Sequence, residues 1–289
     1  MSKELRFTKM HGCGNDYIYI NCLTQTIDSP SQLAKQLSQR RTGIGADGIV
    51  MILPSAIADG RMRMFNMDGS ESGMCGNSIR CVAKYLYDNN IARKEHMRIE
   101  TGSGIKDLSL TVKDGKVIAA RVDMGPAELR PEKIPVNLTG QQIVARPVTI
   151  GSTKQTITCV SMGNPHAVVF ITGMGELGSV ELDSIDMGLM GPLFENNPLF
   201  PERTNVEFAQ VVARNHLKIR VWERGSGETC GSGTGACAAA VAAVLNGYGE
   251  KNTAIHVDMP GGELIIEYTD QTVYMTGNCV TVFEGVVMA

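Results

Sequence analysis

The sequence has little net charge, no long apolar run and no closely spaced pair of cysteines. Its 27 Lys and Arg residues nearly balance 30 Asp and Glu residues, so the formal charge is −3 and nothing favours nucleic acid or an anionic membrane as a partner. No apolar run reaches the ~18 residues of a membrane-spanning helix. The start MSKELRF lacks the apolar segment of a signal peptide. We therefore expect a cytoplasmic protein.

Several cofactor and metal signatures are also lacking. The eight cysteines include no C-x-x-C pair, so reduced thiols are expected rather than a zinc site or a disulfide framework. The five histidines are scattered, which predicts no metal site. GSGTGA follows ETC with no Lys-Ser or Lys-Thr pair, so neither a phosphate loop nor a dinucleotide fingerprint is indicated. We expect no cofactor.

Two short glycine-rich runs stand out: MCGNSIRC at residues 74–81 and ETCGSGTGAC at residues 228–237. Each is followed at once by a stretch with the character of a helix. Glycine lets the backbone approach a ligand closely, and the first N–H groups of a helix have no partner within the helix. Such a helix start favours an anion. We predict one small anionic ligand held between the two helix starts.

Other stretches predict the surrounding elements. Residues 5–23 predict a strand, a glycine turn and a second strand, and residues 31–41 predict a helix. Asp114-Gly115 predicts a tight hairpin turn between two strands. MRMFNM has the composition of core rather than of a cofactor site. Cys81 and Cys237 lie within the predicted helices and are expected to be core residues.

The second half of the sequence repeats the order of the first. IRVWERGSGETCGSGTGAC and the helix after it parallel MRMFNMDGSESGMCGNSIRC and its helix. We predict an α/β (α+β) protein of two pseudo-symmetric lobes, residues 1–125 plus 276–289 and residues 126–275, with the site in the cleft between them. The proline-rich residues 124–135 are expected to link the lobes. The strand-like C-terminal stretch is expected to complete the first lobe.

The residues of these runs suit removal of an α-proton from an amino acid. Inversion requires a base on one face of the α-carbon and an acid on the other, and a thiol can serve as either when a helix start lowers its pKa. N–H groups of the glycine loops could bind the α-carboxylate. Cys75 fits the part of one base; the alternative is a small core residue.

Five motifs taken in order carry a resemblance: HGCGNDY, FNMDGSESGMCGN, VSMGNPH, FPERTNVEF and WERGSGET. Together they resemble the diaminopimelate epimerase family over nearly the whole chain. The resemblance implies a PLP-independent isomerase that inverts LL-diaminopimelate to the meso form for lysine and peptidoglycan synthesis. It also implies two lobes, each a mixed or antiparallel sheet wrapped around a central helix, and a homodimer.

The resemblance further implies roles for single residues. It places the first catalytic cysteine on Cys75 and an accessory role on His166. The α-carboxylate donors fall on Gly76, Asn77, Gly233 and Thr234. The distal groups of the substrate would meet Asn15, Asn66, Asn164, Asn205, Glu223 and Arg224. Taken alone, these residues have plainer alternatives: Asn15 and Asn164 suit turns, and Glu223 and Arg224 suit a surface ion pair.

One position departs from the family pattern, because Ser232 stands where the second catalytic cysteine is expected. Three interpretations are open. In the first, Ser232 is an introduced substitution that blocks turnover or prevents a disulfide; in the second, it is natural and weakens activity. In the third, Cys230 has taken over as the base. We favour the first two interpretations, because a base moved by two residues of extended chain is displaced by several ångströms.

A second departure is Gly48, where relatives place a longer polar side chain. This position leaves a racemase of another amino acid as an alternative. Ser232 motivates a different alternative, an amino-acid-binding relative without catalytic activity.

Overall fold

A computed structural model of the protein describes residues 4–171 and 180–288. The chain divides into two compact units, Met1–Asp123 with Thr276–Ala289, and Met124–Met275. We call them the first and the second unit. Among the described helices, none is long and apolar enough to cross a membrane.

The first unit is a mixed sheet with two helices. Its strands are β1 (Glu4–Gly12), β2 (Asn15–Asn21), β3 (Gly48–Leu53), β4 (Gly60–Asn66), β5 (Glu71–Ser72), β6 (His96–Thr101), β7 (Gly104–Lys113), β8 (Lys116–Asp123) and β18 (Val280–Met288). Its helices are α1 (Pro30–Leu37) and α2 (Gly76–Asp88). β2 runs parallel to β3 and β4 parallel to β6, whereas β18–β1, β1–β2, β3–β4, β4–β5, β6–β7 and β7–β8 are antiparallel pairs. The C-terminal strand therefore completes the sheet of this unit.

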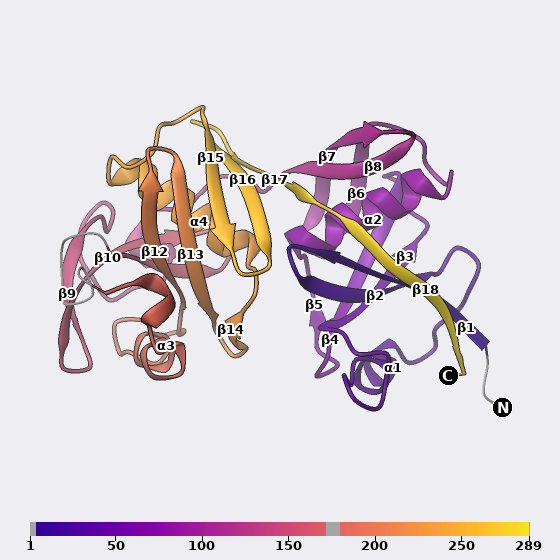
Figure 1. Cartoon of the computed structure of the whole chain (residues 1–289), viewed down its shortest axis with the longest axis horizontal. Coiled ribbons are helices and arrows are strands. Elements are labelled where there is room, and N and C mark those ends of the chain that lie inside the picture. The colour runs from indigo at the N-terminus through magenta and orange to yellow at the C-terminus, as the bar shows by residue number, and fades with distance from the viewer. Residues whose placement is uncertain (1–3, 172–179, 289) are drawn as a thin grey trace. The chain divides into compact units, whose positions relative to one another are not determined.

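Helix α2 is the centre of the first unit. It packs against β1, β2, β4, β6, β7 and β8, and most of its residues are buried on all sides. Figure 1 shows α2 among the strands of its own unit. Met62, Met64 and Phe65 are buried, which confirms the core prediction for this part of MRMFNM, whereas Met67 at its end is 47% exposed. Cys81 is fully buried, and burial raises the pKa of its thiol to about 12, which confirms the predicted core role.

Two local predictions have different outcomes. The hairpin prediction is confirmed, because Asp114 (φ 51°) and Gly115 (φ 75°) form a tight turn between paired Lys113 and Lys116. The helix predicted over residues 31–41 is too long, because α1 ends at Leu37. The chain returns over this helix end, where a Cβ on Gly43 would lie 2.6 Å from the carbonyl oxygen of Leu37.

The second unit repeats this plan. Its strands are β9 (Arg146–Ile150), β10 (Thr153–Ser161), β11 (Pro165–Phe170), β12 (Asn205–Ala213), β13 (His216–Glu223), β14 (Gly227–Thr229), β15 (Ala254–Met259) and β16 (Gly262–Tyr268), and β17 (Val273–Asn278) spans the change from one unit to the other. Its helices are α3 (Met187–Glu195) and α4 (Gly233–Leu245), with short 3-10 turns η1 (Pro131–Lys133) and η2 (Leu182–Ser184). β11 runs parallel to β12 and β13 parallel to β15, as β2–β3 and β4–β6 do in the first unit.

Helix α4 holds the place that α2 holds in the first unit. Its alanine-rich sequence is buried all round and packs against β10, β11, β12, β13, β15 and β16 (Figure 1). Cys237 is fully buried within it, as predicted. Residues 124–135 join the units but belong to the second one. Glu128 exchanges two backbone hydrogen bonds of 2.9 Å with Ser161, so this segment is not a free linker.

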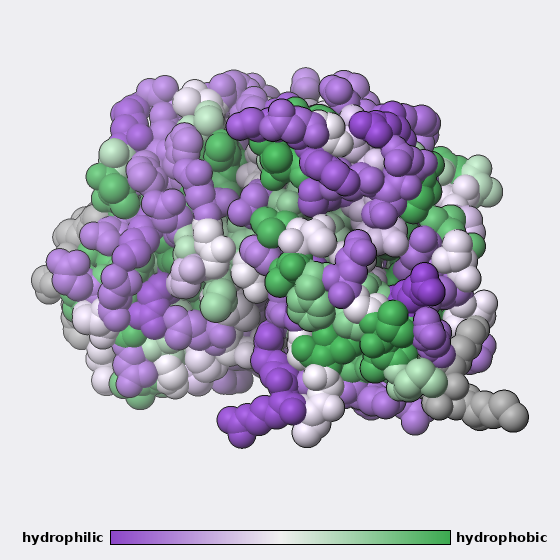
Figure 2. All heavy atoms as spheres, turned by 45° about the vertical axis from the view of Figure 1, so that its right-hand side comes forward, coloured by the Kyte–Doolittle hydropathy of each residue, from purple (hydrophilic) through white to green (hydrophobic). Residues whose placement is uncertain are grey.

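Strand β18 carries apolar side chains on its outside. Val282, Phe283, Val286 and Met288 are each between 46% and 58% exposed. We call these four residues the β18 face. Figure 2 turns the right-hand side of Figure 1 forward and shows apolar side chains gathered at the surface there.

Candidate functional site

The start of α2 brings four of the predicted residues together. Cys75 is the residue immediately before the helix and has an extended backbone (φ −139°, ψ 123°). Its thiol donates to Oδ1 of Asn15 over 3.4 Å, and Nδ2 of Asn77 donates to the same oxygen over 3.4 Å. Gly76 and Asn77 are the first residues of the helix, so their N–H groups have no partner within it.

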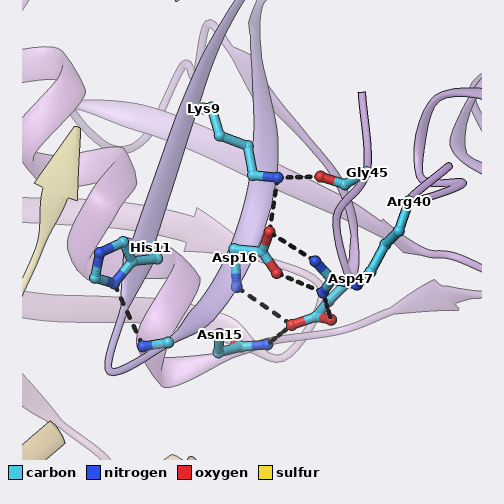
Figure 3. A network of polar contacts seen from close by, with 8 residues as sticks. Lys9, His11, Asn15, Asp16, Arg40, Gly45 and Asp47 are labelled. Carbon is cyan, nitrogen blue, oxygen red and sulfur yellow. Dashed lines mark hydrogen bonds and ion pairs between the residues drawn. The ribbon is translucent and has the colours of Figure 1, made fainter. Parts of the chain in front are cut away.

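A network of charged side chains fixes the orientation of the Asn15 amide through its NH2 group (Figure 3). Nδ2 of Asn15 donates to Oδ2 of Asp47 over 2.7 Å, and Arg40 binds both Asp47 and Asp16 at 2.8 Å. Lys9 binds Asp16 at 2.6 Å and the carbonyl oxygen of Gly45. Burial acts to raise the pKa of Asp16, but the hydrogen bonds from Arg40 and Lys9 outweigh it, so the pKa is lowered. Asp16 is therefore ionised at neutral pH.

Arg80 supports the same helix start from within the core. Its guanidinium is fully buried and donates to the carbonyl oxygen of Gly76 over 3.1 Å and to Oδ1 of Asn77 over 3.0 Å. It also donates to the carbonyl oxygen of Asn278 over 3.2 Å. Neither Arg80 nor Asp47 was predicted as a site residue, because nothing in the sequence around them indicates that they reach the two asparagines.

Asn66 and Gly48 lie opposite each other on paired β4 and β3. The side chain of Asn66 donates to Oγ of Ser70 over 3.0 Å. A Cβ on Gly48 would lie 2.1 Å from the carbonyl oxygen of Phe65, so this backbone has no room for any side chain. The glycine is a packing requirement, and it no longer motivates a different substrate.

The start of α4 repeats the geometry of the start of α2. Ser232 is the residue immediately before the helix, its backbone is extended (φ −117°, ψ 118°), and its Oγ accepts from the N–H of Gly235 over 3.2 Å. Ser232 is buried, whereas Cys230 is exposed. Ser232 therefore has the position before α4 that Cys75 has before α2, and Cys230 does not.

A chain of side chains, half-buried at Asn164 and Thr234 and fully buried at His166 and Glu207, supports this second helix start. Asn164 donates from Nδ2 to Oγ1 of Thr234 over 3.3 Å, and its Oδ1 faces Nε2 of His166 at 3.0 Å. Nδ1 of His166 faces Oε1 of Glu207 at 2.7 Å, and both side chains are fully buried. Burial raises the pKa of Glu207, although His166 opposes the shift. Oε2 of Glu207 has no hydrogen-bond partner among the described residues.

The remaining predicted residues surround the turn after β13. Asn205 donates from Nδ2 to the carbonyl oxygen of Pro165 over 2.7 Å and accepts at Oδ1 from the N–H of Arg224 over 2.8 Å. Arg224 donates to the carbonyl oxygen of Glu202 over 2.7 Å, and Glu223 accepts from Oγ1 of Thr229 over 2.6 Å. These contacts give each member of the Glu-Arg pair its own partner.

Glu195 is a further carboxylate that was not predicted from the sequence. It is buried, accepts at Oε1 from the N–H of Gly225 over 2.9 Å, and accepts at Oε2 from the indole N–H of Trp222 over 2.7 Å. It thus fixes the turn that carries Glu223 and Arg224. Within residues 4–171 and 180–288, no group of three or more His, Cys, Asp or Glu residues is arranged to hold a metal ion.

Each unit thus carries one helix start with an extended residue before it and an asparagine beside it, and the N–H groups of the first two helical residues have no partner within the helix. A helix start of this kind can bind a carboxylate. A thiol held there is in a position to exchange a proton with a bound ligand.

The sequence is similar to known proteins over nearly its whole length. The sequence model of diaminopimelate epimerase matches residues 7–130 and 158–282. The diaminopimelate epimerase of Desulfovibrio desulfuricans is 52% identical over 293 residues, which cover 99% of each chain. That of Acetivibrio thermocellus is 52% identical over 283 residues, which cover 97% of this chain and 98% of the relative.

Solved structures of lower sequence identity share the fold. A PhzF-family phenazine biosynthesis protein of Bacillus anthracis has a TM-score of 0.70 at 17% identity and covers 99% of this chain and all of its own. A hydroxyproline epimerase of Agrobacterium vitis has a TM-score of 0.70 at 14% identity and covers all of this chain and 94% of its own. With the full-length similarity to the curated relatives, the conclusion is plain: this chain belongs to the diaminopimelate epimerase family.

Proposed function

We propose that this protein is an amino-acid epimerase that converts LL-diaminopimelate to meso-diaminopimelate without PLP. The observation that carries the proposal is the matched position of Cys75 and Ser232, each directly before the buried central helix of its unit. Full-length similarity to diaminopimelate epimerases supports the substrate. In the proposed enzyme, lobes 1–125 plus 276–289 and 126–275 each supply one helix start that binds the substrate.

In this proposal one residue works on each face of the α-carbon. The thiolate of Cys75 takes the α-proton, the electron pair stays on the α-carbon, and the side chain at 232 returns a proton from the opposite face. N–H groups of Gly76, Asn77, Gly233 and Thr234 bind the α-carboxylate and stabilise the charge that develops on it. Asn15, Asn66, Asn164, Asn205, Glu223 and Arg224 bind the distal amino and carboxylate groups.

The serine at position 232 sets the expected rate. A hydroxyl is a much weaker acid than a thiol, so it exchanges a proton with a carbanion poorly at neutral pH. Cys230 is a poor candidate for the second base, because it is exposed and lies two residues before the position that Ser232 occupies at the helix start. We infer that this chain inverts its substrate slowly and that Ser232→Cys restores the reaction.

The experiment follows deuterium uptake at the α-carbon from heavy water with LL-diaminopimelate, in this chain and in Ser232→Cys. Uptake together with formation of the meso product supports the proposal. Binding of diaminopimelate without any uptake in either protein would instead support an amino-acid-binding relative. Uptake on other amino acids but not on diaminopimelate would change the substrate.

The proposed assembly is a homodimer in the cytoplasm. The β18 face offers four exposed apolar side chains on one strand, and a second copy of the chain would remove them from water. Within the described residues none of the eight cysteines is in a disulfide, which suits a reducing compartment.

A further inference from the structure

A directed chain of hydrogen bonds crosses the start of α2. Nη2 of Arg80 donates to Oδ1 of Asn77 over 3.0 Å, and Nδ2 of Asn77 donates to Oδ1 of Asn15 over 3.4 Å. Nδ2 of Asn15 then donates to Oδ2 of Asp47 over 2.7 Å. A guanidinium only donates and a carboxylate only accepts, so the charged ends determine the direction of both amides.

We propose that Asp47 is a positioning residue that turns the amide oxygen of Asn15 toward Cys75. The inference rests on the proposed function in one respect, namely that Cys75 is a catalytic base. Held this way, Asn15 offers Oδ1 to the thiol of Cys75 at 3.4 Å and keeps its NH2 group on the far side. In this arrangement the protonated thiol of Cys75 can donate a hydrogen bond to Oδ1 of Asn15. A thiolate of Cys75 would instead face a lone pair of the same oxygen.

Asp47 is itself held in place. Its Oδ1 binds Arg40 at 2.8 Å, and its Oδ2 accepts from the backbone N–H of Asp16 over 3.2 Å as well as from Asn15. The Asp47 side chain is 38% exposed, so a polar replacement there leaves the core packing untouched. These contacts fix the carboxylate relative to β2, which carries Asn15.

The second unit shows that the amide orientation is not a fixed property of the fold. Asn164, beside the start of α4, points its NH2 group at Thr234 and its oxygen at His166. The second partner of each asparagine differs: the Asp47 carboxylate accepts from the NH2 group of Asn15, whereas the His166 ring faces the amide oxygen of Asn164. The partner therefore selects which end of the amide faces the helix start.

Other ionisable groups act on Cys75 besides this chain. Tyr19 on β2 and Cys81 on α2 interact electrostatically with it and are both fully buried, and Arg80 lies within the same helix. Asp47 and Asp16 are carboxylates of the network behind Asn15. Because Asp16 binds Arg40 and Lys9 rather than the Asn15 amide, it serves as a control for loss of a negative charge.

The test is the pH dependence of Cys75 alkylation by iodoacetamide in the full chain, followed by mass spectrometry of the Cys75 peptide. In Asp47→Asn and Asp47→Ala the amide of Asn15 is free to turn its NH2 group to the sulfur. We expect the pH of half-maximal rate to fall by about half to one unit, which is the effect of one hydrogen bond. In Asp16→Asn we expect less than half of that shift.

If Asp47→Asn and Asp16→Asn shift the pH of half-maximal alkylation rate equally, loss of a negative charge alone explains the shift, and the proposal is overturned. No shift, or a rise, in both Asp47 variants would also overturn it. Alkylation needs no turnover, so the result is independent of the epimerase activity. Absence of deuterium uptake with the expected alkylation shift would refute the proposed function and leave the positioning role standing.

Discussion

Cys75 and Ser232 occupy the same place in their own units. Each directly precedes a central helix of 13 residues, each has an extended backbone, and each is followed by glycine. The two helices differ in their surroundings, since a buried Arg80 supports the first start and a buried Glu207 lies close to the second. The proposed chemistry assigns one face of the substrate to each of these residues.

The first prediction concerns the residue at 232. Ser232→Cys should speed inversion of LL-diaminopimelate by at least about a hundredfold, because a positioned acid or base contributes on the order of 10²- to 10⁴-fold. Chiral chromatography of the product gives the rate. Cys230→Ala is the matched control and should leave the rate of either protein unchanged. Loss of activity in that control would instead make Cys230 the second base.

The second prediction concerns the packing around Gly48. Gly48→Ala should lower the free energy of unfolding by at least about 2 kcal/mol, because its Cβ would need the carbonyl of Phe65 to move. Urea unfolding measures the change. Gly188→Ala is the control, since its Cβ would meet Asp186 at an ordinary 3.4 Å. A Gly48→Ala protein as stable as the parent would refute the packing requirement.

The third prediction concerns the buried Glu207. Its pKa is raised in the folded state, so the native protein binds this proton more tightly than the unfolded chain. Its contribution to stability is therefore fully present below the unfolded value of about 4.3 and declines as pH rises above it. Glu207→Gln should gain stability relative to the parent between pH 5 and pH 8, on the order of 1 kcal/mol. A difference that is constant or declines across this range counts against a raised pKa.

The fourth prediction concerns the β18 face. Val282 and Val286 are both more than half exposed on β18. Changing both to Lys should weaken the proposed dimer at least tenfold, as measured by sedimentation equilibrium. Ile118→Lys, at a position on β8 that is 46% exposed, is the control and should have no effect. A dimer that survives the double change would place the interface elsewhere.

The sequence predicts the features that depend on neighbours along the chain. The Asp114-Gly115 turn, the two strands joined at Gly14 and the glycine-led starts of α2 and α4 all follow from local backbone preference. The predicted end of α1 was wrong, because the helix stops where the chain folds back over it at Gly43, and that close contact is not visible in the local sequence. Helix α3 was not predicted, since Pro192 lies within it and its start depends on the Asp186 side chain.

Only those site residues that lie within the recognisable sequence motifs could be predicted. The positions of Cys75 and Ser232 follow from the glycine runs, but the residues behind them do not. Glu207 lies in an apolar strand, and a charge in the run NVEF is the one local signal that it is buried for a reason. Asp47 is 32 residues from Asn15, and only the parallel pairing of β2 with β3 brings them together.

The most direct test of the two-base account follows the isotope in Ser232→Cys during the first turnovers in heavy water. If Cys75 and the residue at 232 act on opposite faces, the meso product carries deuterium at the inverted carbon while recovered LL-substrate retains its original hydrogen. If a single residue both removes and returns the proton, the early product retains the original hydrogen instead. That second result would contradict the central claim.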